Sequence, residues 1–226
     1  MFPNAYKGVK KLYSAEILSL IVIIMSIISA VLLIVSAALL QAQPEVELAG
    51  GLLGVLGLVV VIASGVLALI AFIFNLIGLI QAKKDEYSFR VALYFTVLGI
   101  ILSVFISAFS SKEFLYSIFS TGANLANLLT TIFIVMGIMA LAAKLENDAM
   151  IQKGKFILKV IVCVEVLALI ASIISTIFRF NAGQILAGVL LLVSGVLNIV
   201  AYFIYLGYLS KAKKMLKPDE QPQPQE

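Results

Sequence analysis

The chain has 226 residues, of which 62% are hydrophobic and only 12% are charged, with a formal net charge of +4. An average soluble domain carries charge on about a quarter of its residues, so this composition excludes a water-soluble protein. Its apolar content excludes intrinsic disorder, and an all-α integral membrane protein is the class that remains.

The first sixteen residues combine lysines with aromatic side chains. Phe2, Tyr6 and Tyr13 recur near helical spacing, with Lys10 and Lys11 between them. This pattern predicts either an amphipathic helix that lies on the cytoplasmic leaflet at residues 1–16 or a disordered basic lead-in. The two alternatives stay open at this point.

Six apolar stretches follow, each long enough for a helix to cross a hydrocarbon core of about 30 Å. They cover residues 17–40, 50–80, 91–109, 117–142, 156–178 and 185–209. We therefore predict six transmembrane helices. Strands of a membrane barrel are excluded because they alternate apolar and polar residues in short segments. The last residues, 215–226, are rich in proline and glutamine and are predicted to be a disordered cytoplasmic tail.

Basic residues lie almost entirely on one side of the predicted spans. Of the 16 lysines and arginines, only Lys112 and Arg179 lie on the other side. The positive-inside rule therefore predicts that both termini are cytoplasmic. The excess charge predicts attraction to anionic lipids of the inner leaflet rather than to nucleic acid. The use of lysine and isoleucine with little arginine is typical of bacteria, which favours a bacterial plasma membrane as the cell membrane concerned.

The six spans read as three copies of one hairpin. The sequence Ser-Gly-Val-Leu occurs at 64–67 and at 194–197, and Ala-Lys-Lys follows at 82–84 and at 212–214. The third and fifth spans align at an offset of 69 residues, and so do the fourth and sixth. We predict three parallel helical-hairpin repeats, at 17–86, 87–148 and 149–214. The first is longer, and its extra residues predict an outer loop at 41–49.

One charged residue lies deep within a predicted span. Glu165 is about 9 Å inside the boundary at 1.5 Å per residue, where a charge costs about 2.5–3.5 kcal/mol. Such a group faces protein or water. Ser19 and Thr96 have the same position in their repeats as Glu165, so the three side chains are predicted to converge. They would form either a site for a proton, a cation or a polar headgroup, or a hydrogen-bonded contact between helices. The complete candidate polar site is Glu165, Ser19, Thr96, Asn198 and Tyr205.

A seam of small residues follows one face of the second span and recurs on the sixth. Its members are Gly50, Gly54, Gly57, Ser64, Ala71, Gly78, Ser194 and Ala201. A period of seven residues keeps one face against a neighbouring helix, and small side chains allow close approach. The seam predicts packing within a hairpin or, alternatively, a face for a second copy of the chain or another membrane protein.

The residue types also limit the chemistry. The chain has no histidine, which is the commonest general base and zinc ligand, and the single cysteine, Cys163, cannot form an intramolecular disulfide. We therefore predict no catalytic activity, no metal and no cofactor. The first functional hypothesis is a non-enzymatic membrane scaffold or accessory subunit. The alternative is a small transporter or channel that uses the Glu165 carboxylate for proton or cation coupling.

Overall fold

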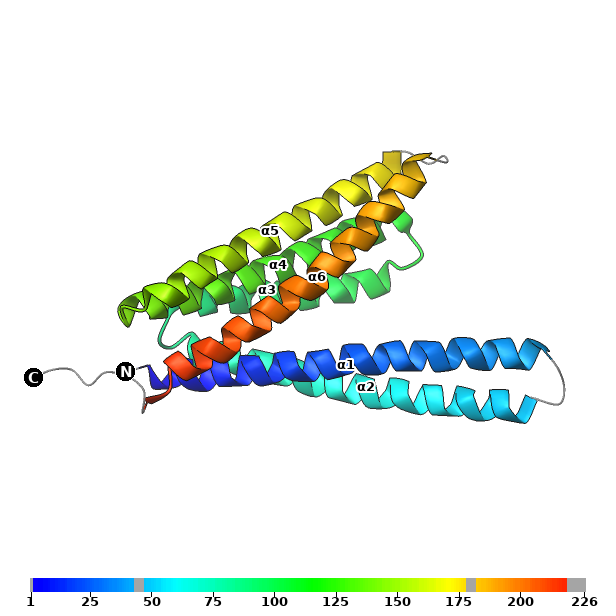
Figure 1. Ribbon diagram of the computed structural model, residues 1–226, viewed down its shortest axis with the longest axis horizontal. Coiled ribbons are helices and arrows are strands. Elements are labelled where there is room, and N and C mark those ends of the chain that lie inside the picture. Colours follow the sequence, from blue (N-terminus) through cyan, green and yellow to red (C-terminus); the bar gives the residue numbers. More distant parts are fainter. Residues whose placement is uncertain (1, 43–46, 178–181, 219–226) are drawn as a thin grey trace, which may run out of the picture. The chain divides into compact units, whose positions relative to one another are not determined.

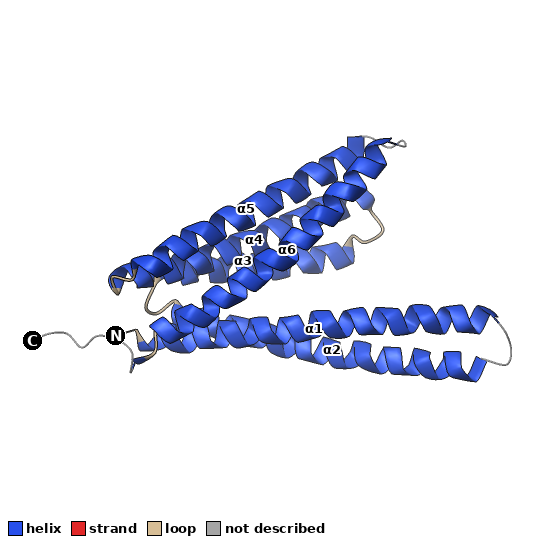
Figure 2. Ribbon diagram, viewed as in Figure 1, coloured by secondary structure: helices blue, strands red, loops and turns tan. Residues whose placement is uncertain are grey.

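The computed structural model describes residues 2–42, 47–177 and 182–218, and nearly all of these are helical. The prediction of an all-helical chain is confirmed, because Figure 2 shows only helices and connecting turns in the described part. The six helices are α1 (Pro3–Ala42), α2 (Glu47–Ala82), α3 (Tyr87–Ala108), α4 (Glu113–Lys144), α5 (Asp148–Ile177) and α6 (Ala182–Met215) (Figure 1).

Five helical segments of the described chain are long and apolar enough to cross a membrane. They are Pro3–Leu40, Leu48–Ala82, Tyr87–Ala108, Phe114–Lys144 and Gly188–Met215. These segments support a multi-pass membrane protein. The remaining predicted span, 156–178, falls on α5 and includes residues whose side chains lie outside the described part.

The chain forms two compact units. One consists of residues 10–78 and is the α1/α2 hairpin without its ends, and the other consists of residues 1–9 and 79–226. In the larger unit, α3 packs against α4, α4 against α5, and α5 against α6. Helices that follow one another along the chain are therefore neighbours in space, as short connections favour.

The first hairpin differs from its sequence-based prediction at both ends. α1 runs without a break for 40 residues, so the lead-in from Pro3 onward is continuous with the first span. No glycine or proline interrupts residues 9–43, and the Ser14 hydroxyl donates to the carbonyl of Lys10. At the other end, α1 reaches Ala42 and α2 begins at Glu47. The extra residues of this hairpin therefore mostly lengthen its two helices.

A polar cluster joins three parts of the larger unit at one end. The Asp85 carboxylate accepts hydrogen bonds from the backbone N–H of Ala5 (2.7 Å) and from the side-chain amide of Asn4 (2.9 Å). A carboxylate at the start of a helix satisfies free amides and complements the helix dipole. The neighbouring Glu86 forms an ion pair with Lys144 at 2.7 Å. The start of α1 is thus held to the α2–α3 turn, which is held to the end of α4.

Candidate functional site

The residues of the predicted polar site are divided between the two units. Glu165 is half-buried on α5 and has no hydrogen bond or ion pair to any residue that the structure describes. On α6, Asn198 is exposed, whereas Tyr205 is buried. Ser19 belongs to the smaller unit. Within the larger unit, the structure describes no hydrogen bond from Glu165 to Asn198 or Tyr205.

Thr96 has partners within its own hairpin. Its hydroxyl donates to the carbonyl of Ala92 at 3.0 Å and lies 3.4 Å from the hydroxyl of Thr130 on α4. Thr130 in turn donates to the carbonyl of Ala126 at 2.9 Å. These bonds satisfy both hydroxyls in an apolar environment, so the structure gives Thr96 a contact between α3 and α4.

The first three glycines of the small-residue seam, Gly50, Gly54 and Gly57, lie against α1. A Cβ added to Gly57 would lie 3.0 Å from the side chain of Leu33, and one added to Gly54 would lie 2.8 Å from the hydroxyl oxygen of Ser36. That hydroxyl also donates to the carbonyl of Gly50 at 2.7 Å. The glycines therefore let the two backbones approach closely within this hairpin, as small residues do in membrane helix pairs.

The three hairpins bury corresponding positions. On the second helix of each hairpin, the buried residues recur every seven positions, at 64, 71 and 78 in α2, at 123, 130 and 137 in α4, and at 194, 201 and 208 in α6. On the first helices of the last two hairpins they are Phe89, Ala92 and Gly99 in α3, and Gly154, Ile157 and Val164 in α5. This burial register relates α3 to α5 by 65 residues and α4 to α6 by 71.

The burial register differs from the offset of 69 that the sequence suggests. In the burial register, Thr96 corresponds to Ile161. Glu165 lies four residues, or about one helical turn, beyond Ile161, and it stays on nearly the same face because four residues leave a net rotation of only about 40°. The pattern therefore does not place Glu165 at the same depth as Thr96. The difference arises because Val164 and Ser194 are 30 residues apart, whereas Gly99 and Ala123 are 24 apart, and the six extra residues lengthen α5 and α6.

Each of the last two hairpins sets a glycine opposite a large buried residue. In the second hairpin, a Cβ added to Gly137 would lie 2.8 Å from the ring of Phe89. In the third, the sizes are exchanged, because the glycine is Gly154 on α5 and the large residue is Tyr208 on α6. The Tyr208 hydroxyl would lie 2.7 Å from the added Cβ, and the side chain of Met139 on α4 would lie nearer still. This exchange brings a hydroxyl group to a position that is apolar in the second hairpin.

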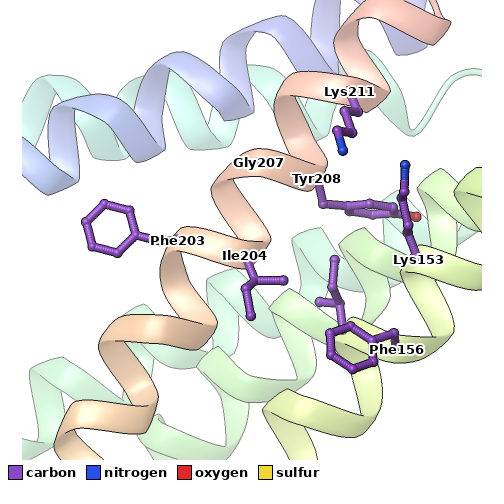
Figure 3. Close-up of a pocket in the computed structure, with 8 residues that line it drawn as sticks. Lys153, Phe156, Phe203, Ile204, Gly207, Tyr208 and Lys211 are labelled. Carbon is purple, nitrogen blue, oxygen red and sulfur yellow. The ribbon is translucent and has the colours of Figure 1, made fainter.

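A cavity of about 310 Å³ lies between α5 and α6 beside Tyr208 (Figure 3). Its lining residues are Lys153, Phe156, Ile157, Phe203, Ile204, Gly207, Tyr208 and Lys211. Figure 3 shows the amino groups of the two lysines close together at one end of the cavity, with Phe156 and Ile204 toward the other. We call this set of residues the lysine cavity.

The polar groups of the lysine cavity lack complementary partners. The Tyr208 side chain is 2% exposed, and its hydroxyl has no hydrogen-bond partner among the described residues. Interaction with the neighbouring Lys211 amino group, which includes the repulsion of like charges, lowers the pKa of Lys153. Neither lysine forms an ion pair with a described acidic residue. Two cations and a hydroxyl donor are together suited to bind an anion.

Sequence reasoning missed the lysine cavity. From the sequence, Lys153 and Lys211 indicate only the predicted cytoplasmic side. A signal was present, because Lys153 and Phe156 on α5, and Phe203, Gly207 and Lys211 on α6, are spaced by three or four residues and so share a helix face.

The described residues contain no group of three or more histidine, cysteine, aspartate or glutamate side chains that could hold a metal ion. The lysine cavity instead offers charge, a hydroxyl group and an apolar wall. Comparisons of the chain with protein families, with curated protein sequences and with solved structures give no match.

Proposed function

We propose that the protein is a non-enzymatic scaffold or accessory subunit of a bacterial cell membrane. In this proposal its six helices span the bilayer as three parallel hairpins, with both termini in the cytoplasm. The observation that carries the proposal is the common burial register, because three hairpins that bury corresponding residues are typical of a repeated packing unit. The lysine-rich ends of the hairpins support the orientation.

The use of polar groups inside the apolar segments supports a packing role. The hydroxyls of Ser29, Ser64 and Ser103 each donate to a carbonyl of their own helix, at 3.0, 2.8 and 2.9 Å. The hydroxyl of Ser36 crosses instead to α2. Hydroxyls bonded in this way are satisfied within the apolar segments and add nothing to a polar path across the bilayer.

The exposed apolar surface supports an interaction role. Ile34 of α1 and Ile62 of α2 are 69% and 68% exposed, and Val104 of α3 is 64% exposed. Lipid tails or the apolar face of another membrane helix can cover such side chains. A scaffold uses this surface to associate with a second copy of the chain or with another membrane protein.

The scaffold proposal is tested by gentle extraction followed by native mass spectrometry. We expect a complex of fixed stoichiometry that contains either a second copy of the chain or another membrane protein. The same extraction of an unrelated six-helix protein from the same cells provides the control. A monomer that carries only bulk lipid would contradict the proposal.

The orientation is tested by cysteine labelling in a Cys163→Ser background. A cysteine at Gln43 should react with a membrane-impermeant thiol reagent applied to intact cells. A cysteine at Ser210 should react only after the membrane is permeabilised, and the Cys163→Ser parent should not react at all. The opposite pattern would overturn the orientation.

The second candidate function is that of a small transporter or channel, and the half-buried Glu165 carboxylate favours it. A carboxyl group within an apolar helix is costly and is often a proton or ion site. Glu165→Gln should then abolish a pH-dependent flux into proteoliposomes while the protein still folds. Glu146→Gln, which alters an exposed carboxylate in a turn, is the control. A parent protein without flux across a broad substrate panel would contradict transport.

A further inference from the structure

We propose that the lysine cavity binds one anionic phospholipid. The headgroup phosphate lies between the amino groups of Lys153 and Lys211, and an acyl chain runs along Phe156 and Ile204. This inference rests on the proposed function in one respect, which is that the lipid is assigned to the cytoplasmic leaflet. The cavity and its chemistry stand on the contacts between α5 and α6.

Charge is the first reason. Lys153 and Lys211 bring two positive charges together without an acidic partner in the described chain. A phosphate between them replaces a repulsion with two charge-assisted hydrogen bonds, and lysine is a common phosphate ligand. Tyr208 adds a hydroxyl donor whose hydrogen-bonding capacity is unused among the described residues.

The cavity has a charged end and an apolar end, and this arrangement favours a lipid over a soluble anion. On α6, Phe203 precedes Lys211 by eight residues, which corresponds to about 12 Å along the helix axis. Phe156 and Phe203 are 57% and 52% exposed, so the apolar end is open to the surroundings of the bundle. The charged and apolar ends are therefore separated along the helices as a headgroup and its chains are separated in a leaflet. A free phosphate ion would use only the charged end.

The site is particular to the third hairpin. By the burial register, the positions of Lys153 and Lys211 correspond to Ser88 and Ala140 in the second hairpin, where Gly137 stands in place of Tyr208. In the first hairpin, Gln81 corresponds to Lys211. Non-specific attraction to an anionic leaflet depends on lysines at every hairpin end. A bound lipid would require the set of groups that α5 and α6 combine.

The test is a lipid titration of the full chain in neutral detergent, followed by native mass spectrometry. The probes are phosphatidylglycerol and phosphatidylcholine with identical chains. We expect one phosphatidylglycerol to bind at least tenfold more tightly than phosphatidylcholine. Lys153→Gln with Lys211→Gln should weaken phosphatidylglycerol binding at least tenfold. The matched control, Lys155→Gln with Lys214→Gln, removes the same charge from exposed lysines of the same helices outside the cavity and should change the affinity less than threefold.

A second variant fills the cavity and leaves every charge in place. A Cβ added to Gly207 meets no atom within 4 Å, so Gly207→Leu should fold and place its side chain in the cavity. Gly195→Leu on the same helix is equally unobstructed and lies outside the cavity. We expect the first variant to weaken phosphatidylglycerol binding at least fivefold and the second to leave it unchanged.

Three results would overturn the proposal. They are equal affinities for the two lipids, an equal loss in both lysine variants, and full displacement of the lipid by millimolar inorganic phosphate, which would indicate a site for a soluble anion. The scaffold proposal fails separately, because it depends on a partner of fixed stoichiometry. A loss of lipid preference that leaves the partner in place would count against the lipid site alone.

Discussion

The contact between Gly137 and Phe89 makes a quantitative prediction about the packing of α3 on α4. In Gly137→Ala, the new methyl group would lie 2.8, 2.9 and 3.0 Å from three carbons of the Phe89 ring. The optimal separation of such carbons is about 3.5–4.0 Å, so the ring must move by more than half an ångström. Phe89 is completely buried, which leaves the ring no open space to enter.

The expected free-energy change combines two effects of opposite sign. Overpacking of a buried site costs about 1–3 kcal/mol, whereas alanine favours a helix over glycine by about 1 kcal/mol. Gly195→Ala isolates the second effect, because nothing lies within 4 Å of its new methyl group. We therefore expect Gly137→Ala to be less stable than Gly195→Ala by about 1–3 kcal/mol. At roughly 2–4 °C per kcal/mol, the melting temperature should be lower by several degrees.

Melting temperatures are measured from the loss of the monodisperse chromatographic peak after heating in detergent. Phe89→Leu removes the ring atoms that obstruct the methyl group, so Gly137→Ala should cost at least 1 kcal/mol less in that background. Two results would refute the reasoning. One is equal stability of Gly137→Ala and Gly195→Ala, and the other is simple additivity of Gly137→Ala and Phe89→Leu.

Three other contacts make predictions of the same kind. Asp85→Ala removes the hydrogen bonds from the Asn4 side chain and the Ala5 amide, so it should lower the free energy of unfolding by about 1–2 kcal/mol. It should also speed hydrogen exchange at the Ala5 amide, and unchanged exchange would contradict this prediction. Gly54→Ala should lower the stability of the first hairpin, because the new Cβ would lie 2.8 Å from the Ser36 hydroxyl oxygen. In a Ser36→Ala background the same substitution should cost less stability, and equal costs in both backgrounds would show that the two side chains do not clash. Lys211→Gln removes a like charge, so the pKa of Lys153 should rise in a ¹³C NMR titration of the methylated protein, and a constant pKa would show that the two amino groups do not interact.

The sequence is sufficient to predict most helix positions in this chain. The predicted span 117–142 lies within α4 (Glu113–Lys144), and the predicted span 91–109 covers α3 (Tyr87–Ala108) except for its first four residues. The agreement has a simple cause, since a helix that crosses a bilayer needs an unbroken apolar run and charged residues mark its ends. The same signal does not report how far a helix continues beyond the apolar run, and α1 therefore extends back to Pro3.

The register between the hairpins was harder to predict, because most residues of the spans are apolar and resemble one another at many offsets. A shift of two residues rotates a helix by about 200° and exchanges its buried and exposed faces. The offset of 69 differs from the burial register of α4 and α6 by two residues. The burial of Thr130 and Ala201 at corresponding positions distinguishes the two alignments.

The lysine cavity depends on tertiary contacts that no local pattern predicts. Lys153 and Lys211 are 58 residues apart, and only the pairing of α5 with α6 brings them to one cavity. Tyr208 is buried there with its hydroxyl close to Gly154, which has no side chain to obstruct it. The predicted polar site around Glu165 was inferred from a repeat position instead, and its convergence stays a prediction.

The exchange of large and small residues links the packing of the third hairpin to its chemistry. A glycine faces a large side chain at this level of both the second and third hairpins, and a Cβ added to either glycine would lie less than 3.0 Å from that side chain. In the second hairpin the large residue is Phe89 on α3, which fills the contact with carbon atoms alone. In the third it is Tyr208 on α6, so the same packing rule brings a phenol hydroxyl beside two lysines. A repeat can thus acquire a binding site without any change in which helix faces are buried, and this explains how hairpins with one packing pattern can differ in what they bind.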